Sequence, residues 1–124
     1  MTEKDLALLI SNILYDKKAS DIVTLKVGHL TVLADYLVIA TGRSALQVQA
    51  LAEHVEKGLA NKGTLPRRIE GRGDMRWVVM DYAHVIVHIF RPEEREYYHL
   101  ERLWADGQNQ LALPFDRAED ALEA

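Results

Sequence analysis

Residues 36–41, Tyr-Leu-Val-Ile-Ala-Thr, form a continuous apolar run that ends at Gly42. An unbroken run of this length is typical of a strand buried on both faces, whereas a half-exposed strand alternates. Ser44 and Gln47 follow with the spacing of a helix capping box. Apolar residues then continue at helical spacing to the stop signal Asn-Lys-Gly at residues 61–63. The centre of the chain is therefore predicted to be a buried strand followed by an amphipathic helix.

The same periodicities predict three helices and five strands in the whole chain. An amphipathic helix is expected at residues 2–16, with Thr2 as its cap, and a last helix at residues 92–98 begins at Pro92. Strands are expected at residues 21–27, 36–41, 67–70, 77–81 and 85–91. Because only three residues join the last two strands, they should form an antiparallel hairpin. The order α-β-β-α-β-β-β-α predicts a mixed five-stranded sheet with packed helices, of the α/β (α+β) class.

Length and composition are those of one globular domain. The chain has 124 residues, of which 48% are hydrophobic and 27% charged, enough to bury a core. It has no cysteine, which excludes disulfides, thiolate metal sites and a cysteine nucleophile. No apolar run approaches the roughly 18 residues of a membrane helix, so the sequence predicts a cytoplasmic protein without a membrane partner.

The charge is acidic and unevenly distributed. A net charge of -4 argues against nucleic acid as the main partner, since proteins that neutralise many phosphates are usually basic. Much of it lies in residues 114–124, which hold four carboxylates and one arginine. We expect residues 1–113 to form a single domain and residues 114–124 to form an acidic, flexible tail that is dispensable for folding. The nearly neutral domain suits a protein partner at least as well as a polyanion.

The turn from Gly42 to Ser44 could hold an anion at a helix N-terminus and resembles the Gly-Ser element of nucleotidyltransferases. Those enzymes need carboxylates one residue apart on a following strand to hold Mg²⁺. No such pair follows here, because Asp35 and Asp81 each stand alone at a strand end. A capped helix after a tight turn explains the segment better, so we expect no catalytic residues and no cofactor.

Three histidines, His84, His88 and His99, raise the question of a metal site. His84 and His88 share a strand face but are separated by roughly 13 Å, too far for one zinc ion. His88, which lies between Val87 and Ile89, is better explained as a hydrogen-bonded histidine on a sheet face. We therefore expect no metal ligands.

Two further features bear on binding partners. The arginines at positions 67, 68, 72 and 76 form a basic cluster beside Trp77, but Glu70 and Asp74 weaken its field. Exposed arginines in solvated turns explain the cluster better than an RNA-binding patch, although contact with an RNA-rich assembly stays open.

Strand parity puts Trp77, Val79 and Asp81 on one face of their strand and Val78 and Met80 on the other. If one of these sets faces solvent on an open side of the sheet, its aromatic and aliphatic side chains would mark a protein interface. The sequence leaves open whether both sets instead belong to the core.

Several motifs in this order resemble the ribosomal silencing factors, also called the Iojap family. The resemblance covers residues 6 to 104. It rests on Asp21-Ile22, Asp35-Tyr36-Leu37-Val38-Ile39-Ala40-Thr41-Gly42, Ser44, Glu70-Gly71, Trp77-Val78-Val79-Met80-Asp81, Val85-Ile86-Val87-His88-Ile89-Phe90 and Tyr98-His99-Leu100-Glu101-Arg102-Leu103-Trp104. The chain departs from the common family pattern at Leu46, where a basic residue is usual, and at Ala83-His84, where Gly-Asp is usual.

The resemblance implies a non-catalytic, nucleotidyltransferase-like domain that binds the fourteenth protein of the large ribosomal subunit. Occupying that face would block joining of the small subunit and repress translation when nutrients are scarce. Trp77, Val79 and Asp81 are the expected partner-binding residues, and Tyr98 is a further candidate that could equally pack under the sheet. A minor contact with ribosomal RNA and a homodimer stay open, and the alternative is a nucleotide-binding enzyme of the nucleotidyltransferase type.

Overall fold

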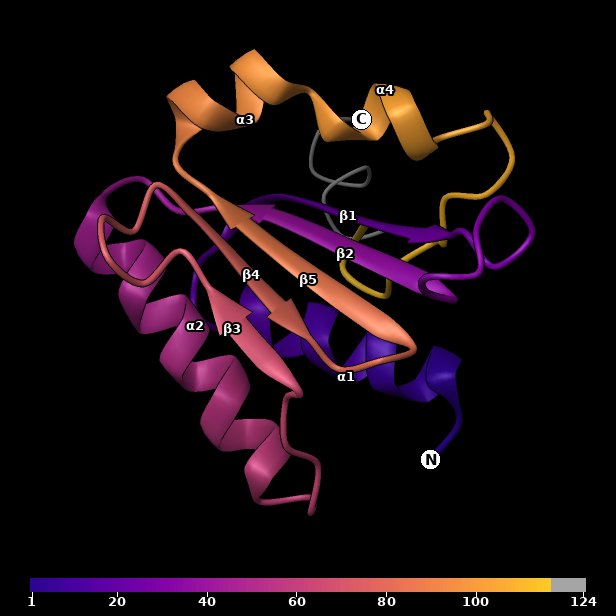
Figure 1. The fold of residues 1–124 in the computed structure, drawn as a ribbon, viewed down its shortest axis with the longest axis horizontal. Coiled ribbons are helices and arrows are strands. Elements are labelled where there is room, and N and C mark those ends of the chain that lie inside the picture. The colour runs from indigo at the N-terminus through magenta and orange to yellow at the C-terminus, as the bar shows by residue number, and fades with distance from the viewer. Residues whose placement is uncertain (117–124) are drawn as a thin grey trace.

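A computed structural model describes residues 1–116 and contains a five-stranded mixed sheet with helices on both faces (Figure 1). The strands are β1 (Ser20–Lys26), β2 (Tyr36–Thr41), β3 (Arg68–Glu70), β4 (Trp77–Asp81) and β5 (Val85–Phe90). The helices are α1 (Glu3–Asp16), α2 (Ala45–Ala60), α3 (Pro92–Tyr98) and α4 (Leu100–Trp104). The predicted fold class is confirmed, and the predicted elements are found with shifts of one residue at some ends.

The strand order is β1-β2-β5-β4-β3, with β2 and β5 parallel and the other neighbours antiparallel. All six residues of β2 are buried, as the unbroken apolar run predicts. The predicted hairpin of β4 and β5 is confirmed, with Trp77 opposite Phe90 and Asp81 opposite Ile86. At its tip, Ala83 has a φ of +72°, in the left-handed region that a three-residue loop commonly uses.

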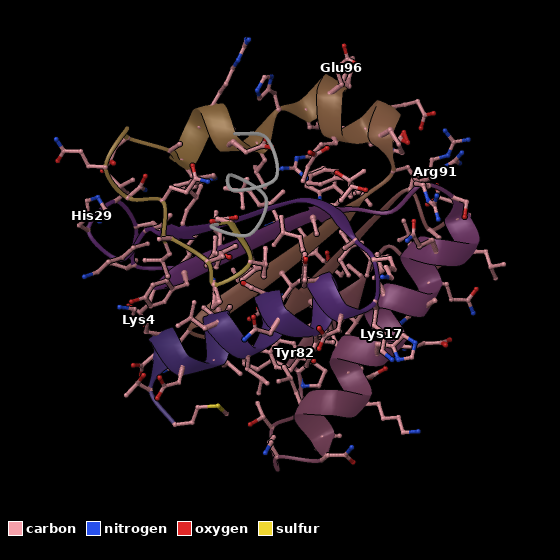
Figure 2. All side chains as sticks on the ribbon, turned by 180° about the vertical axis from the view of Figure 1, so that it is seen from behind. Lys4, Lys17, His29, Tyr82, Arg91 and Glu96 are labelled. Carbon is pink, nitrogen blue, oxygen red and sulfur yellow. The ribbon has the colours of Figure 1, made fainter. Side chains whose placement is uncertain are left out.

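The two faces of the sheet are covered differently. Helices α1 and α2 lie together on one face and α3 and α4 on the other (Figure 1). The larger core lies between the sheet and the helices α1 and α2. Tyr82, which is labelled in Figure 2, belongs to this core. Its members include Ile10, Leu14, Leu51 and Val55 from the helices. Burial of these apolar faces is the main stabilising contribution to the domain.

Local hydrogen bonds fix where the two long helices begin. At α1, Thr2 and Asp5 form a complete capping box, in which each side chain accepts from the other's backbone N–H at 3.1 Å. At α2, the predicted box forms only in part. The Ser44 hydroxyl accepts from the Gln47 N–H at 3.1 Å, but the Gln47 side chain accepts from Arg43, one residue before the position that the motif requires.

The last predicted helix is followed by a second one. Residues 92–98 form α3 as expected, but the chain then turns at His99, with a φ of +45°, and starts the five-residue helix α4. Arg95 ties this region to the sheet edge: it donates to the Thr41 hydroxyl and to the Asp21 carbonyl, both at 2.8 Å, and pairs with Glu101. The short helix escaped the sequence analysis because five residues carry too little periodicity to detect.

The expected tail begins inside the packed part of the structure. Phe115 is only 8% exposed, and its ring stacks on that of Tyr15 with centroids 4.1 Å apart. The Asp116 carboxylate accepts from the Leu113 N–H at 2.9 Å. Phe115 and Asp116 therefore pack on the domain, whereas Pro114 is exposed, and the boundary at residue 114 stays a prediction that truncation can test. The rest of the expected tail, residues 117–124, lies outside the described residues.

Candidate docking surface on the sheet

The face of β4 that points away from α1 and α2 carries the residues predicted to bind a partner. Trp77, Val79 and Asp81 are all partly exposed. Val78 and Met80 alternate with them and are completely buried in the core beneath the helices. The strand thus buries one set of side chains and leaves the other partly accessible, so β4 is not core on both faces.

Trp77 is held in place by contacts on several sides. Its ring stacks on Phe90 with centroids 4.8 Å apart, and its indole N–H donates to His88 Nδ1 at 3.0 Å. The register explains these contacts, because Trp77 pairs with Phe90 directly and His88 lies two residues earlier on the same face of β5. A tryptophan with a satisfied N–H and a partly exposed ring has the form of an interface anchor.

His88 is a neutral part of this arrangement. Burial lowers the pKa of His88 from 6.5 to about 4, so the ring is uncharged near neutral pH. Because an indole can only donate, Nδ1 of His88 must accept and the ring proton resides on Nε2. The expectation of a hydrogen-bonded histidine on a sheet face is confirmed.

Tyr98 completes the cluster from the end of α3. Its ring lies 4.7 Å from that of Trp77 and makes an edge contact at 5.0 Å with Tyr97. Tyr98 is 48% exposed and Tyr97 82% exposed. We call Trp77, His88, Phe90, Tyr97 and Tyr98 the aromatic cluster. Trp77 and Tyr98 were each predicted from the sequence as partner-binding residues. Their contact with each other could not be predicted, because it depends on how α3 folds back over the sheet.

Asp81 lies at the far end of β4 and has partners within the chain. Its carboxylate accepts from the Ala83 N–H at 2.8 Å and pairs with the Arg67 guanidinium at 3.2 Å. Partial burial alone would raise the pKa of Asp81, but these two hydrogen bonds outweigh it and leave the pKa below its ordinary value. Asp81, the last residue of β4, is therefore a charged group whose hydrogen-bonding capacity is largely used within the chain.

The basic cluster is neutralised by neighbouring carboxylates. Arg67 pairs with Asp81, and the other three pairs are Arg68 with Glu70 at 3.4 Å, Arg72 with Glu56 at 2.5 Å and Arg76 with Asp74 at 3.8 Å. A patch that binds phosphates needs cations free to face them. These pairings favour the account of solvated arginines over an RNA-binding patch.

Packing and helix capping explain which residues occupy the turn before α2. A Cβ at Gly42 would lie 2.8 Å from Val48 Cγ2, so glycine allows α2 to pack closely on β2. The Ser44 hydroxyl and the Gln47 side chain occupy the N–H groups of Gln47 and Arg43. Asp35 and Asp81 lie at the opposite ends of their strands from this turn, roughly 20 Å away along the sheet. These carboxylates are not placed to hold a metal beside a phosphate at Ser44.

An open groove of about 860 Å³ lies elsewhere, between the end of α1, the start of β1 and the segment from α3 to α4. Arg95 is the arginine that lines this groove, and its guanidinium group already donates to Thr41, Asp21 and Glu101. The guanidinium group of Arg95 is therefore not free to bind a ligand in this groove.

Comparison with known proteins decides the family. The sequence profile of a family described as "Ribosomal silencing factor during starvation" matches residues 1–123. The chain belongs to the ribosomal silencing factor family. A relative from Halalkalibacterium halodurans, "Ribosomal silencing factor RsfS", is 40% identical over 107 residues, which cover 86% of this chain and 92% of the relative.

Two more members of this group of relatives extend the comparison. A crystal structure of a protein from Chromobacterium violaceum superposes with a TM-score of 0.83 at 34% identity, covering 91% of this chain and 94% of that one. The mouse protein "Mitochondrial assembly of ribosomal large subunit protein 1" is 31% identical over 81% of this chain, which spans 45% of the mouse protein. The resemblance inferred from the motifs is confirmed, and so is a role in ribosome-associated silencing. As a ribosomal silencing factor, the chain belongs to a family of regulatory proteins.

None of the helices within residues 1–116 combines the length and the apolar character needed to cross a bilayer.

Proposed function

We propose that this ribosomal silencing factor binds the large ribosomal subunit at its fourteenth protein and blocks joining of the small subunit. The protein would thereby repress translation under nutrient limitation, as a stoichiometric inhibitor and not as a catalyst. The observation that carries the proposal is the aromatic cluster on the sheet face that α1 and α2 leave uncovered. Tryptophan and tyrosine are the side chains most enriched among residues that dominate binding energy.

The chemistry of this face fits a protein partner. Trp77 is rigidly held by Phe90 and His88, so little conformational entropy is lost when it is covered. Tyr97 and Tyr98 supply exposed rings with polar tips at the rim, and Val79 adds an aliphatic surface beside His88. The guanidinium groups of Arg67 and Arg68, at the start of the strand beside β4, are paired with carboxylates, so the attraction would come from buried apolar area more than from these charges.

Steric inhibition predicts a definite stoichiometry. Purified protein added to separated ribosomal subunits should lower the yield of joined ribosomes on a sucrose gradient, and the effect should saturate near one copy per large subunit. The inhibitor should comigrate with the large subunit and be absent from the small-subunit fraction. Complete inhibition at a small fraction of one copy would require a catalytic mechanism and would overturn the proposal.

The nucleotidyltransferase alternative has a separate test. Calorimetric titration with a nucleoside triphosphate and Mg²⁺ should give no heat of binding at micromolar concentrations, because Asp35 and Asp81 lie far from the Ser44 turn. Appreciable affinity would instead support the enzymatic alternative.

A further inference from the structure

Three side chains from distant parts of the chain converge at one end of the central strands β2 and β5, the end opposite the Ser44 turn. They are Glu3 in the first turn of α1, Asp35 immediately before β2, and His84 in the hairpin between β4 and β5. One donor atom from each lies within 4.8 Å of the donors of the other two, and the closest pair, His84 Nδ1 and Asp35 Oδ2, is 2.8 Å apart. Figure 1 shows the start of α1, the start of β2 and this hairpin at the same edge.

We propose that Glu3, Asp35 and His84 bind a divalent first-row metal ion such as Zn²⁺. One imidazole and two carboxylates are ligands that zinc accepts, with bonds of about 2.0 to 2.2 Å that place donor atoms roughly 3 to 4 Å apart. Asp35 Oδ2 and His84 Nδ1 are 2.8 Å apart and share a hydrogen bond, so the metal would replace the shared proton and the two donor atoms would separate by a few tenths of an ångström, to roughly 3 Å or more. Glu3 is exposed, so its flexible side chain can move by the remaining distance of about 1 Å without disturbing the core.

The backbone holds two of the three ligands in fixed positions. The carbonyl oxygen of His84 accepts from the N–H groups of Asp35 and Tyr36, at 2.8 and 3.1 Å. The carbonyl of Asp35 accepts in turn from Val27 and Gly28. A Cβ at Gly28 would lie 3.0 Å from Asp35 Oδ1, so glycine leaves the space that the carboxylate occupies. Such preorganisation lowers the cost of assembling a metal site.

Charge supports binding but limits its strength. Two carboxylates with a neutral imidazole carry a charge that a divalent cation would cancel, and within residues 1–116 no ion pair joins Glu3 to a lysine or arginine. Lys4 and Lys26 line the adjoining hollow, and Figure 2 labels Lys4 at this edge. Their positive charge opposes a cation, so we expect micromolar rather than nanomolar affinity.

The bound ion would cross-link separate segments of the fold. It would join the first turn of α1 to β2 and to the hairpin, three segments that the sequence separates by about 80 residues. With three protein ligands, its remaining coordination positions would hold water. Neither the spacing of the three histidines nor the isolated positions of Asp35 and Asp81 predicted this site, because Glu3, Asp35 and His84 come from segments whose proximity only the fold reveals.

The experiment is calorimetric titration of ZnCl₂ into tag-free protein, with His84→Ala, Glu3→Gln and His29→Ala as variants. His29 is the matched control, because it also faces a carboxylate, Asp106, at 2.8 Å, but no third metal-ligating side chain within residues 1–116 converges on this pair. We expect one Zn²⁺ per chain, binding at least about tenfold weaker in His84→Ala and in Glu3→Gln, and unchanged binding in His29→Ala. At a hundredfold excess over Kd, the melting temperature of the wild type should rise by about 5 °C or more.

The possible outcomes distinguish a specific zinc site from nonspecific zinc binding. Wild-type protein that takes up no zinc at micromolar concentration would overturn it. So would a loss in His29→Ala as large as in His84→Ala, which would indicate adventitious binding to surface histidines. Retention of full affinity in Glu3→Gln would also overturn it, since the site would then lack its third ligand. None of these results bears on ribosome binding, so the two proposals fail independently.

Discussion

At the scale of single residues, Trp77 and His88 determine the character of the candidate docking surface. Strand parity alone placed Trp77 on the same side as Val79 and Asp81, and the structure shows that this is the side away from α1 and α2. The contacts of Trp77 with His88 and Tyr98 could not be read from the sequence. The first depends on the register between β4 and β5, and the second on the path of the chain after β5.

The buried imidazole gives the fold a pH dependence that can be measured. Burial lowers the pKa of His88 to about 4, against 6.5 when exposed. Between these values the unfolded chain binds the proton more readily than the folded one, so stability falls as pH drops from 6.5 towards 4. The slope due to this one group is at most about 1.4 kcal/mol per pH unit.

Urea unfolding from pH 7.5 to pH 4.5 tests this with His88→Leu as the reference. Above pH 7 the variant should be less stable than wild type by about 1 to 3 kcal/mol, because the Trp77 N–H loses its acceptor. That difference should shrink as the pH is lowered through 6.5, since the variant has no imidazole to protonate. Parallel curves at all pH values would show that His88 does not titrate in this way. His54→Leu, at an exposed position on α2, is the control and should stay within about 0.5 kcal/mol of wild type.

At the scale of secondary structure, the strongly patterned elements were predictable and the short ones were not. The unbroken run of β2 and the helical spacing of α2 each had one physical explanation. The helix α4 has only five residues and depends on the left-handed turn at His99, which no sequence signal marks. The strand order was likewise not predicted, because pairing β2 with β5 in parallel depends on contacts about 50 residues apart in the sequence.

The start of α2 provides a test of whether its residues serve the helix or a ligand. Ser44→Ala removes the hydroxyl that accepts from Gln47 and should cost about 1 kcal/mol of stability, a fall in melting temperature of roughly 3 to 5 °C for a domain of this size. Ser44→Asn should restore most of the loss, since asparagine also caps helices. A thermal melt of each variant decides the matter. If Ser44→Ala melts like the wild type, the cap contributes nothing.

At the scale of the whole molecule, the position of the C-terminal boundary can be measured by truncation. Ending the chain after Leu113 removes the stack of Phe115 on Tyr15 and the Asp116 hydrogen bond. We expect a loss of about 2 kcal/mol or more, seen as a melting temperature lower by roughly 6 °C or more. Ending it after Asp116 should change the melting temperature by less than about 2 °C, because the residues removed are mostly acidic or small. Equal melting temperatures for the two truncations would mean that Phe115 adds nothing to stability.

The most direct test of the central claim is titration of the isolated fourteenth protein of the large subunit with wild type and two variants. Trp77→Ala removes the centre of the aromatic cluster, whereas Leu46→Ala removes an apolar side chain that is 77% exposed on α2, which lies on the opposite face of the sheet. Urea unfolding should first show that both variants are folded, with Trp77→Ala less stable by about 1 to 3 kcal/mol because its ring is only partly buried. We predict that Trp77→Ala weakens binding by about 30-fold or more, equivalent to about 2 kcal/mol, and that Leu46→Ala binds like the wild type. Wild-type affinity in folded Trp77→Ala, or no binding by the wild type itself, would contradict the account.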